Sequence, residues 1–158
     1  MLRATVIALT MVGALATPAF ANGLKAEQVV EVATVSVGET GNEVRTYALA
    51  EEVAPGDEVR YSLAYANEGA VSAEAVSLVM PVPAEVTYIE TSAGGTPSTI
   101  TYSVDGGTNF AARDSLFVTS EDGARLASAD EITHIKWAFT ESIPAAATGR
   151  ISFRAVLK

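Results

Sequence analysis

Residues 53–89, VAPGDEVRYSLAYANEGAVSAEAVSLVMPVPAEVTYI, decide the fold of this 158-residue chain. After the turn PGD, bulky side chains that favour burial occur at every second position, namely Val59, Tyr61, Leu63 and Tyr65. A period of two sends successive side chains to opposite faces, which is typical of a strand with one buried face. The segments NEG (67–69) and PVP (81–83) then separate two further short runs. The stretch therefore predicts three consecutive strands joined by turns.

The rest of the chain carries the same pattern. Further alternating runs occupy residues 43–49, 100–104, 116–119, 132–140 and 151–157, and residues 24–37 form a longer run with valines in both phases. The turn DGG (105–107) is a strong hairpin signal, because glycine adopts the positive φ of primed turns. Only residues 122–130 are ambiguous, since 124–127 could form one helical turn. We therefore expect an all-β, immunoglobulin-like antiparallel β-sandwich of about 7–9 strands.

Residues 1–21 have the layout of a secretory signal peptide. Arg3 precedes an uncharged apolar stretch over residues 4–16, and AFA (19–21) is a small-residue cleavage motif. This stretch is shorter than the roughly 17–25 residues that span a bilayer, so we expect cleavage rather than a membrane anchor. The predicted domains are a signal peptide (1–21), an amino-terminal strand segment (22–52) and the sandwich module (53–158). We expect no transmembrane segment in the mature chain.

Composition narrows the function classes. The chain has 19 acidic and 10 basic residues and a formal net charge of −9, which opposes binding to nucleic acid or to anionic lipid. It contains no cysteine, which excludes a disulfide scaffold, thiol catalysis and cysteine metal sites. Together with the signal peptide, these features predict an exported protein that is extracellular, at the cell surface or periplasmic.

A set of turn and core residues also resembles a known family. These residues are Pro55, Gly56, Asp57, Tyr61, Asn67, Gly69, Pro81, Pro83, Tyr88, Trp137 and Phe153. Over residues 53–158 they resemble the domain of unknown function eleven, the conserved repeat domain of bacterial surface proteins. The closing turn PAAA (144–147) departs from the family's Pro-Gly, and the module stands alone rather than in tandem. The resemblance implies an immunoglobulin-like fold and an envelope setting, and no reaction.

Metal binding is the first chemistry to weigh. Calcium needs several oxygen ligands that converge, and the weak candidates are Asp57, Glu58 and Asp105. No EF-hand loop is present, so a solvated acidic surface is the favoured interpretation. Residues 103–110, SVDGGTNF, match the Asp-box pattern, in which the aspartate caps a turn. A turn role is favoured there over a ligand role, and no cofactor is expected.

The chain offers little for catalysis. His134 is the single histidine and cannot form the usual multi-histidine zinc site. Ser115 or Ser128 with Asp130 could complete a triad, but no G-x-S-x-G elbow exists. Trp137 alternates with bulky neighbours and is expected in the core. An esterase-like or glycosidase-like enzyme is therefore the weakest hypothesis, and we expect no enzyme.

Residues 22–37 are the most informative segment for function. They could be the first strand of their own sheet or a donor strand that completes the sheet of a neighbouring subunit. The leading hypothesis is a structural or interaction protein of the bacterial envelope, a homo-oligomer or the partner of another envelope protein, that could form filaments by strand addition. The alternative is a periplasmic or secreted binding module for carbohydrate or protein, which would use loop acids and exposed tyrosines such as Tyr47.

Overall fold

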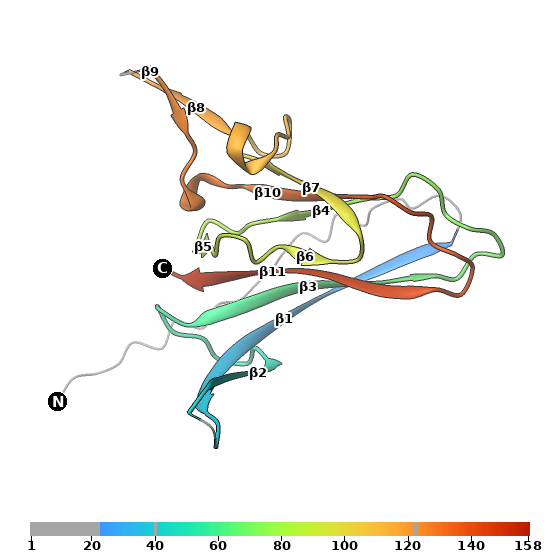
Figure 1. Cartoon of the computed structure of the whole chain (residues 1–158), viewed down its shortest axis with the longest axis horizontal. Helices are drawn as coiled ribbons and strands as arrows, with labels where there is room; N and C mark the ends of the chain where they lie inside the picture. Colours follow the sequence, from blue (N-terminus) through green and yellow to red (C-terminus); the bar gives the residue numbers. More distant parts are fainter. Residues whose placement is uncertain (1–22, 40, 122) are drawn as a thin grey trace.

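The computed structural model describes residues 23–39, 41–121 and 123–158. These residues form eleven β-strands and two short 3-10 turns, η1 (Arg113–Ser115) and η2 (Ala129–Glu131), and the paired strands are antiparallel (Figure 1). Within these ranges there is no α-helix, and so no helix with the length and apolar character needed to cross a bilayer. The all-β, antiparallel prediction is confirmed. The predicted signal peptide, residues 1–21, lies outside the described residues.

The strands form three sheets. The largest has the order β2–β1–β3–β11–β5, with β6 also paired to β11. Its strands are β1 (Leu24–Val37), β2 (Glu43–Leu49), β3 (Glu58–Asn67), β5 (Val86–Tyr88), β6 (Gly94–Gly95) and β11 (Thr148–Leu157). The second sheet has the order β4–β10–β7, with β4 (Ser77–Pro81), β7 (Ser98–Ser103) and β10 (His134–Phe139). The strands β8 (Phe117–Ser120) and β9 (Gly123–Leu126) form a separate two-stranded sheet.

One hydrophobic core lies between the two larger sheets. The ring centroids of Tyr65 and Phe139, from β3 and β10, are 5.2 Å apart. Those of Tyr88 and Tyr102, from β5 and β7, are 5.6 Å apart. Trp137 on β10 has no exposed surface, which confirms its predicted place in the core. Burial of each large side chain contributes on the order of 1.5–3 kcal/mol, so these contacts hold the sheets together.

The predicted number of strands was too low. The described residues form eleven strands rather than about 7–9, and residues 124–127, which the sequence left ambiguous, form no helical turn because most of them belong to β9. β9 pairs with β8, with Val118 opposite Arg125, and this ladder satisfies more backbone groups than one isolated turn could. Gly94 and Gly95 form the short strand β6, which pairs with β11. A Cβ at Gly95 would collide with the carbonyl oxygen of Arg150, so only glycine fits there.

Strand β1 pairs within its own chain, as the first of the two interpretations of residues 22–37 expects. Its residues Leu24–Val32 pair with β3, and Glu31–Val37 pair with β2. Leu24 is buried in the core, whereas the far end of β1 and its partner β2 are mostly exposed. In Figure 1, β1 and β2 lie at one margin of the large sheet, away from β11. The first half of β1 is therefore anchored to the core and the second half is not.

Candidate interaction edge and polar surface

The backbone of β1 alternates between two neighbours. The N–H of Glu68 donates to the carbonyl of Gly23 at 2.8 Å, so odd-numbered residues of β1 bond toward β3. The N–H of Ala50 donates to the carbonyl of Val30 at 3.1 Å, on the opposite side of the strand. Even-numbered residues of β1 therefore direct their N–H and C=O groups away from β3.

This alternation leaves one stretch of backbone without a strand partner. The pairing with β2 begins only at Glu31, so no described strand pairs with β1 on this side between Leu24 and Val29. We call the backbone groups of Leu24, Ala26 and Gln28 on this side the open edge. Each residue offers one donor and one acceptor, and an unpaired row of such groups is a template for another strand.

The sheet edges at β4, β7 and β2 are less suited to receive a strand. The N–H of Phe139 donates to the carbonyl of Val76, so even-numbered residues of β4 bond to β10. The backbone groups of its odd-numbered residues therefore point away from β10. One of these outward positions is Pro81, which has no N–H. On β7, Tyr102 already forms a bridge with Ala111. The edge of β2 is free of described strands, but none of its residues belongs to the core, so it is less rigidly held.

Charged side chains flank the open edge. Lys25 and Glu27 are both exposed and lie on the outer face of the sheet, two positions apart. The ammonium of Lys25 lies 2.6 Å from Oε2 of Glu68, in the turn that follows β3. The lysine side chain is nevertheless 71% exposed. Gln28 is exposed, and Ala26 packs partly against the core. An approaching strand would therefore meet alternating charge on the outer face and small or uncharged residues on the inner one.

The outer face of the large sheet carries a polar network centred on Glu31. Its Oε2 accepts hydrogen bonds from Arg60 at 2.8 Å and from the hydroxyl of Ser62 at 3.4 Å. Arg150 approaches the same oxygen at 3.7 Å. These residues come from β1, β3 and β11, so a single carboxylate joins three neighbouring strands. The ion pair between Arg60 and Glu31 is partly buried, so salt screens it less than it screens an ion pair on the surface.

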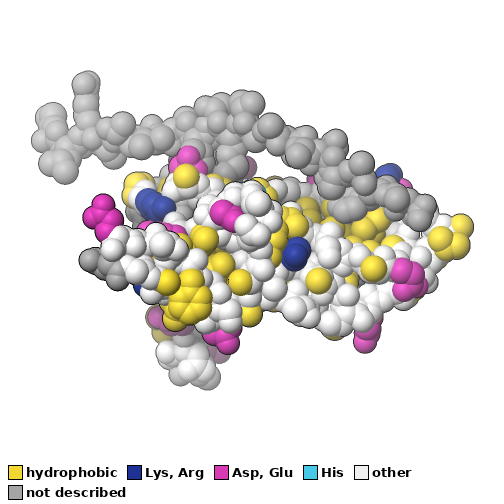
Figure 2. Space-filling view, turned by 90° about the horizontal axis from the view of Figure 1, so that it is seen from above, with side chains coloured by type: hydrophobic (Ala, Val, Ile, Leu, Met, Phe, Trp, Pro, Cys, Tyr) yellow, Lys and Arg dark blue, Asp and Glu magenta, His cyan; other side chains and the backbone are white. Residues whose placement is uncertain are grey.

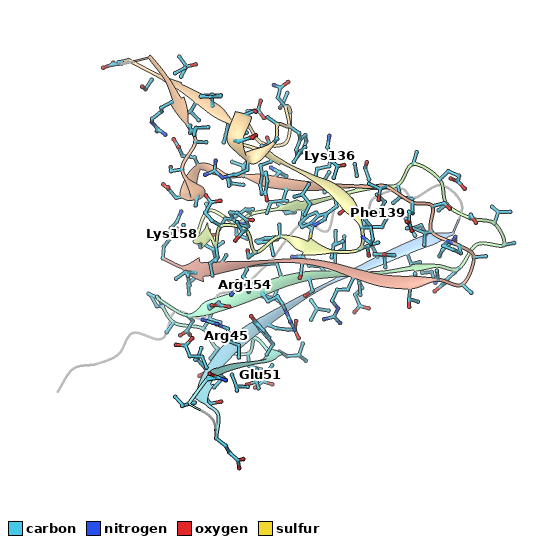
Figure 3. The ribbon with its side chains drawn as sticks, in the orientation of Figure 1. Arg45, Glu51, Lys136, Phe139, Arg154 and Lys158 are labelled. Atoms are coloured by element: carbon cyan, nitrogen blue, oxygen red, sulfur yellow. The ribbon has the colours of Figure 1, made fainter. Side chains whose placement is uncertain are left out.

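A second carboxylate, Glu58, extends this network toward β2. It accepts hydrogen bonds from Arg154 at 2.9 Å and from the hydroxyl of Tyr47 at 3.1 Å, and Arg45 lies 3.6 Å away (Figure 3). Burial raises the pKa of the Glu58 carboxyl, but the hydrogen bonds from Arg154 and Tyr47 outweigh it and lower the pKa. Arg60 also covers the ring of Tyr47 at 3.8 Å, so this tyrosine is engaged within its own chain. Both carboxylate oxygens of Glu58 therefore face an opposite charge.

The Asp-box segment forms the turn that its sequence predicts. Asp105 Oδ1 accepts hydrogen bonds from the hydroxyl of Ser103 at 2.7 Å and from the N–H of Asn109 at 2.9 Å. The amide of Asn109 donates to the other oxygen at 2.7 Å. These bonds, led by that from the Asn109 backbone, hold the pKa of Asp105 well below its usual range. The ring of Phe110, the last residue of the segment, lies 4.4 Å from the ammonium of Lys136.

The three calcium candidates do not form one cluster. Asp57 accepts a hydrogen bond from the N–H of Ala54 at 2.7 Å within its turn. Glu58 belongs to the polar network, and Asp105 caps a turn at the end of β7. Among residues 23–39, 41–121 and 123–158, no group of three or more histidine, cysteine, aspartate or glutamate side chains is placed to hold a metal ion.

The triad candidates are likewise engaged elsewhere. The hydroxyl of Ser115 donates to Asp114 at 3.1 Å, and that of Ser128 donates to Glu131 at 2.8 Å. His134 lies within hydrogen-bond distance of its neighbour's hydroxyl, and burial lowers the pKa of its ring. In the described part of the chain, neither serine is bonded to the histidine. Neither of these two serines is therefore placed to pass its proton to His134.

The two-stranded sheet borders a shallow surface depression. Figure 2 views the molecule from the side that carries β8 and β9, where hydrophobic side chains lie among acidic ones. The depression has a volume of about 640 Å³ and is lined by Glu90, Ala112, Arg113, Asp114 and Leu126. Arg113 and Glu90 close one side by bonding to each other at 2.6 Å. The remaining lining is open, so the depression is not a formed ligand pocket.

Sequence reasoning missed the residues of the open edge and the network around Glu31. Strand alternation places Lys25, Glu27 and Glu31 on one face, but only sheet order reveals which side lacks a neighbour. A signal was present in part, since charged residues recur in the outer phase of three strands. Comparisons with protein-family models, with curated proteins and with solved structures found no match for the chain. The resemblance to the conserved repeat domain therefore stays a prediction.

Proposed function

We propose that this chain is an exported, non-enzymatic structural or interaction subunit of the bacterial cell envelope. It works by accepting a partner's strand along the open edge of β1, and it folds as an immunoglobulin-like sandwich. Repeated contacts of this kind, together with a second interface, would build a surface assembly or filament. The observation that carries the proposal is the open edge itself, formed by Leu24, Ala26 and Gln28.

The open edge is suited to strand addition because it is already ordered. β1 is held by β3 over the whole of Leu24–Val32, and Leu24 is buried in the core. Binding of an incoming strand would therefore cost the acceptor strand little conformational entropy. Main-chain hydrogen bonds supply affinity in such contacts, and side chains on either face supply specificity.

Export is supported by the pattern of residues 1–21, and the envelope setting by the resemblance over residues 53–158. The mutual neutralisation of the polar groups supports a role without catalysis. Export has its own test, because cleavage after Ala21 removes a defined mass. Mass spectrometry of the protein from the cell exterior or periplasm should show a chain that begins at residue 22, and an uncleaved chain would contradict export by this route.

Substitution of Gln28 tests the proposal without removing a strand from the sheet. Gln28→Pro deletes an N–H that faces the open edge and none of the bonds to β3, so the fold should survive. We expect the purified protein to associate with rising concentration in sedimentation velocity, and the Gln28→Pro variant to remain monomeric. Gln28→Ala keeps the N–H and is the matched control. A wild-type chain that stays monomeric up to millimolar concentration, or a proline variant that associates like wild type, would contradict the proposal.

A further inference from the structure

We infer that the strand received by the open edge is the same segment of a second copy, paired antiparallel about a two-fold axis at Ala26. The inference rests on the proposed function and adds to it the partner and the register. It follows from three properties of the open edge: its length, its bonding phase and the order of its charges.

The length and phase of the open edge limit the possible registers. At one end the hydrogen bond from Ala50 to Val30 occupies the edge, and at the other Gly23 turns toward Glu68 with a φ of +80°. Between them only even-numbered residues present backbone groups, so these must lie opposite even-numbered residues of the second copy. A two-fold axis can therefore lie at residue 25, 26 or 27.

An axis at Ala26 forms the most hydrogen bonds. It places Ala26 opposite Ala26 of the second copy, and Leu24 and Gln28 opposite Gln28 and Leu24 of that copy. All three residues of the open edge are then paired, with two hydrogen bonds in each pair. An axis at residue 25 pairs only Leu24 and Ala26 among the described residues. An axis at residue 27 sets Leu24 opposite Val30, whose carbonyl already accepts a hydrogen bond from the N–H of Ala50.

The charges select the same register. With the axis at Ala26, Lys25 lies directly opposite Glu27 of the second copy, and Glu27 opposite its Lys25. These are non-hydrogen-bonded pairs, in which the side chains are closest and opposite charges stabilise the ladder. An axis at residue 25 would oppose two lysines, and one at residue 27 two glutamates, both destabilising. An edge lysine ordinarily discourages strand pairing, so here the charge pattern admits one register and penalises its neighbours.

Among the described residues, the side chains at the centre of the contact and beyond Glu27 are small. Ala26 meets its own copy on the inner face, where its methyl groups leave room for close backbone contact. On the outer face, Val29 lies opposite Gly23 of the second copy, and this glycine has no side chain. The product is one continuous sheet made of two copies of the large sheet.

Single-cysteine variants test the register, since the chain has no cysteine of its own. Non-hydrogen-bonded antiparallel pairs have Cα atoms about 4.5 Å apart, within the range of a disulfide. We expect a mixture of Lys25→Cys and Glu27→Cys chains to form a disulfide-linked dimer under mild oxidation, and neither variant to do so alone. A dimer from Lys25→Cys alone would indicate an axis at residue 25, and one from Glu27→Cys alone an axis at residue 27. Either result would overturn the inference.

Charge exchange gives a second, non-covalent readout. Lys25→Glu and Glu27→Lys should each weaken dimerisation by about tenfold, because both symmetric pairs become repulsive. The double exchange should restore it. Glu68→Gln removes the ion pair that Lys25 forms within its own chain and should leave dimerisation unchanged. This control distinguishes that ion pair from the proposed pair between Lys25 and Glu27 of the second copy. If charge exchange has no effect, the register is wrong.

The outcomes also separate this inference from the proposed function. If no cysteine pair links but Gln28→Pro still abolishes association, the open edge accepts a different strand, and only the inference fails. If no pair links and Gln28→Pro has no effect, both fail.

Discussion

Strand β4 and the first half of β1 each lack a described neighbouring strand on one side, but these two sides differ. β4 has five residues, and its outward-facing positions end at Pro81, which cannot donate a hydrogen bond. β1 has fourteen residues, and its open edge contains no proline. Natural sheets blunt their edges with proline, charge or short length, because an unpaired strand invites aggregation. The contrast teaches that a proline interrupts the outward backbone groups of β4, whereas the open edge of β1 keeps all of its groups and is flanked only by the charges of Lys25 and Glu27.

The largest effect is expected where β1 joins the core. Asn67, opposite Leu24, is buried, and its amide donates to the carbonyls of Val71 and Ile143 at 2.9 and 2.8 Å. Asn67→Ala leaves these acceptors unsatisfied and should lower the free energy of unfolding by about 1–3 kcal/mol in urea titrations. The exposed Ser72→Ala, in the same loop, should change it by less than about 0.5 kcal/mol. Equal effects of the two substitutions would mean that Asn67 does not anchor this end of β1.

Low pH should destabilise the second sheet, because the carboxylates of Glu131 and Asp105 hold turns next to its strands. Glu131 bonds Arg125 and the N-cap residue Ser128, and these bonds lower the pKa of Glu131 to about 2 from 4.5. Asp105 also has a lowered pKa. A carboxyl whose pKa is lower in the folded state stabilises above its unfolded pKa, and that contribution is lost as pH falls through the folded pKa.

Stability should therefore decline as pH falls from about 4.5 toward 2, measured as the urea midpoint at each pH. Glu131→Gln and Asp105→Asn should each be less stable at pH 7 and show a shallower decline. A variant whose midpoint follows the same pH curve as wild type would show that its carboxyl is not part of this linkage.

The smallest effect on stability is expected at Pro81. Pro81→Ala restores an outward N–H on β4 and removes no hydrogen bond, so the free energy of unfolding should change by about 1 kcal/mol or less. Its effect should appear instead in association, since β4 would then resemble the open edge. Light scattering at high concentration should detect more assembly than for the wild type. No change in scattering would show that proline is not what blunts this edge.

The inner faces of the strands were predictable from sequence because they follow from local alternation. Val59 and Tyr61 are buried on β3, Phe153 and Ile151 are buried on β11, and the first strand begins and ends within the predicted residues. The short strand β6 was not predictable, because its two glycines carry no pattern and pair with a segment more than fifty residues away. Local pattern therefore determines which face of a strand is buried, while pairing across the sequence does not follow from it.

The open edge was unpredictable for the same reason. Residues 24–37 form one long run with valines in both phases, and nothing in it shows that β2 covers only the second half. The network around Glu31 also needed the order β1–β3–β11 before Arg60 and Arg150 could be placed beside it. What the sequence does indicate is a candidate segment, since residues 22–37 are predicted as a first strand or a donor strand and the open edge lies within them.

Amide hydrogen exchange along β1, measured by NMR at low and high protein concentration, tests the central claim most directly. The amides of Lys25, Glu27 and Val29 face β3 and should be protected at both concentrations. Those of Ala26 and Gln28 face the open edge and should exchange rapidly in dilute protein and slowly in concentrated protein. Rapid exchange of Ala26 and Gln28 at every concentration would contradict the account, because it would mean that no strand is added there.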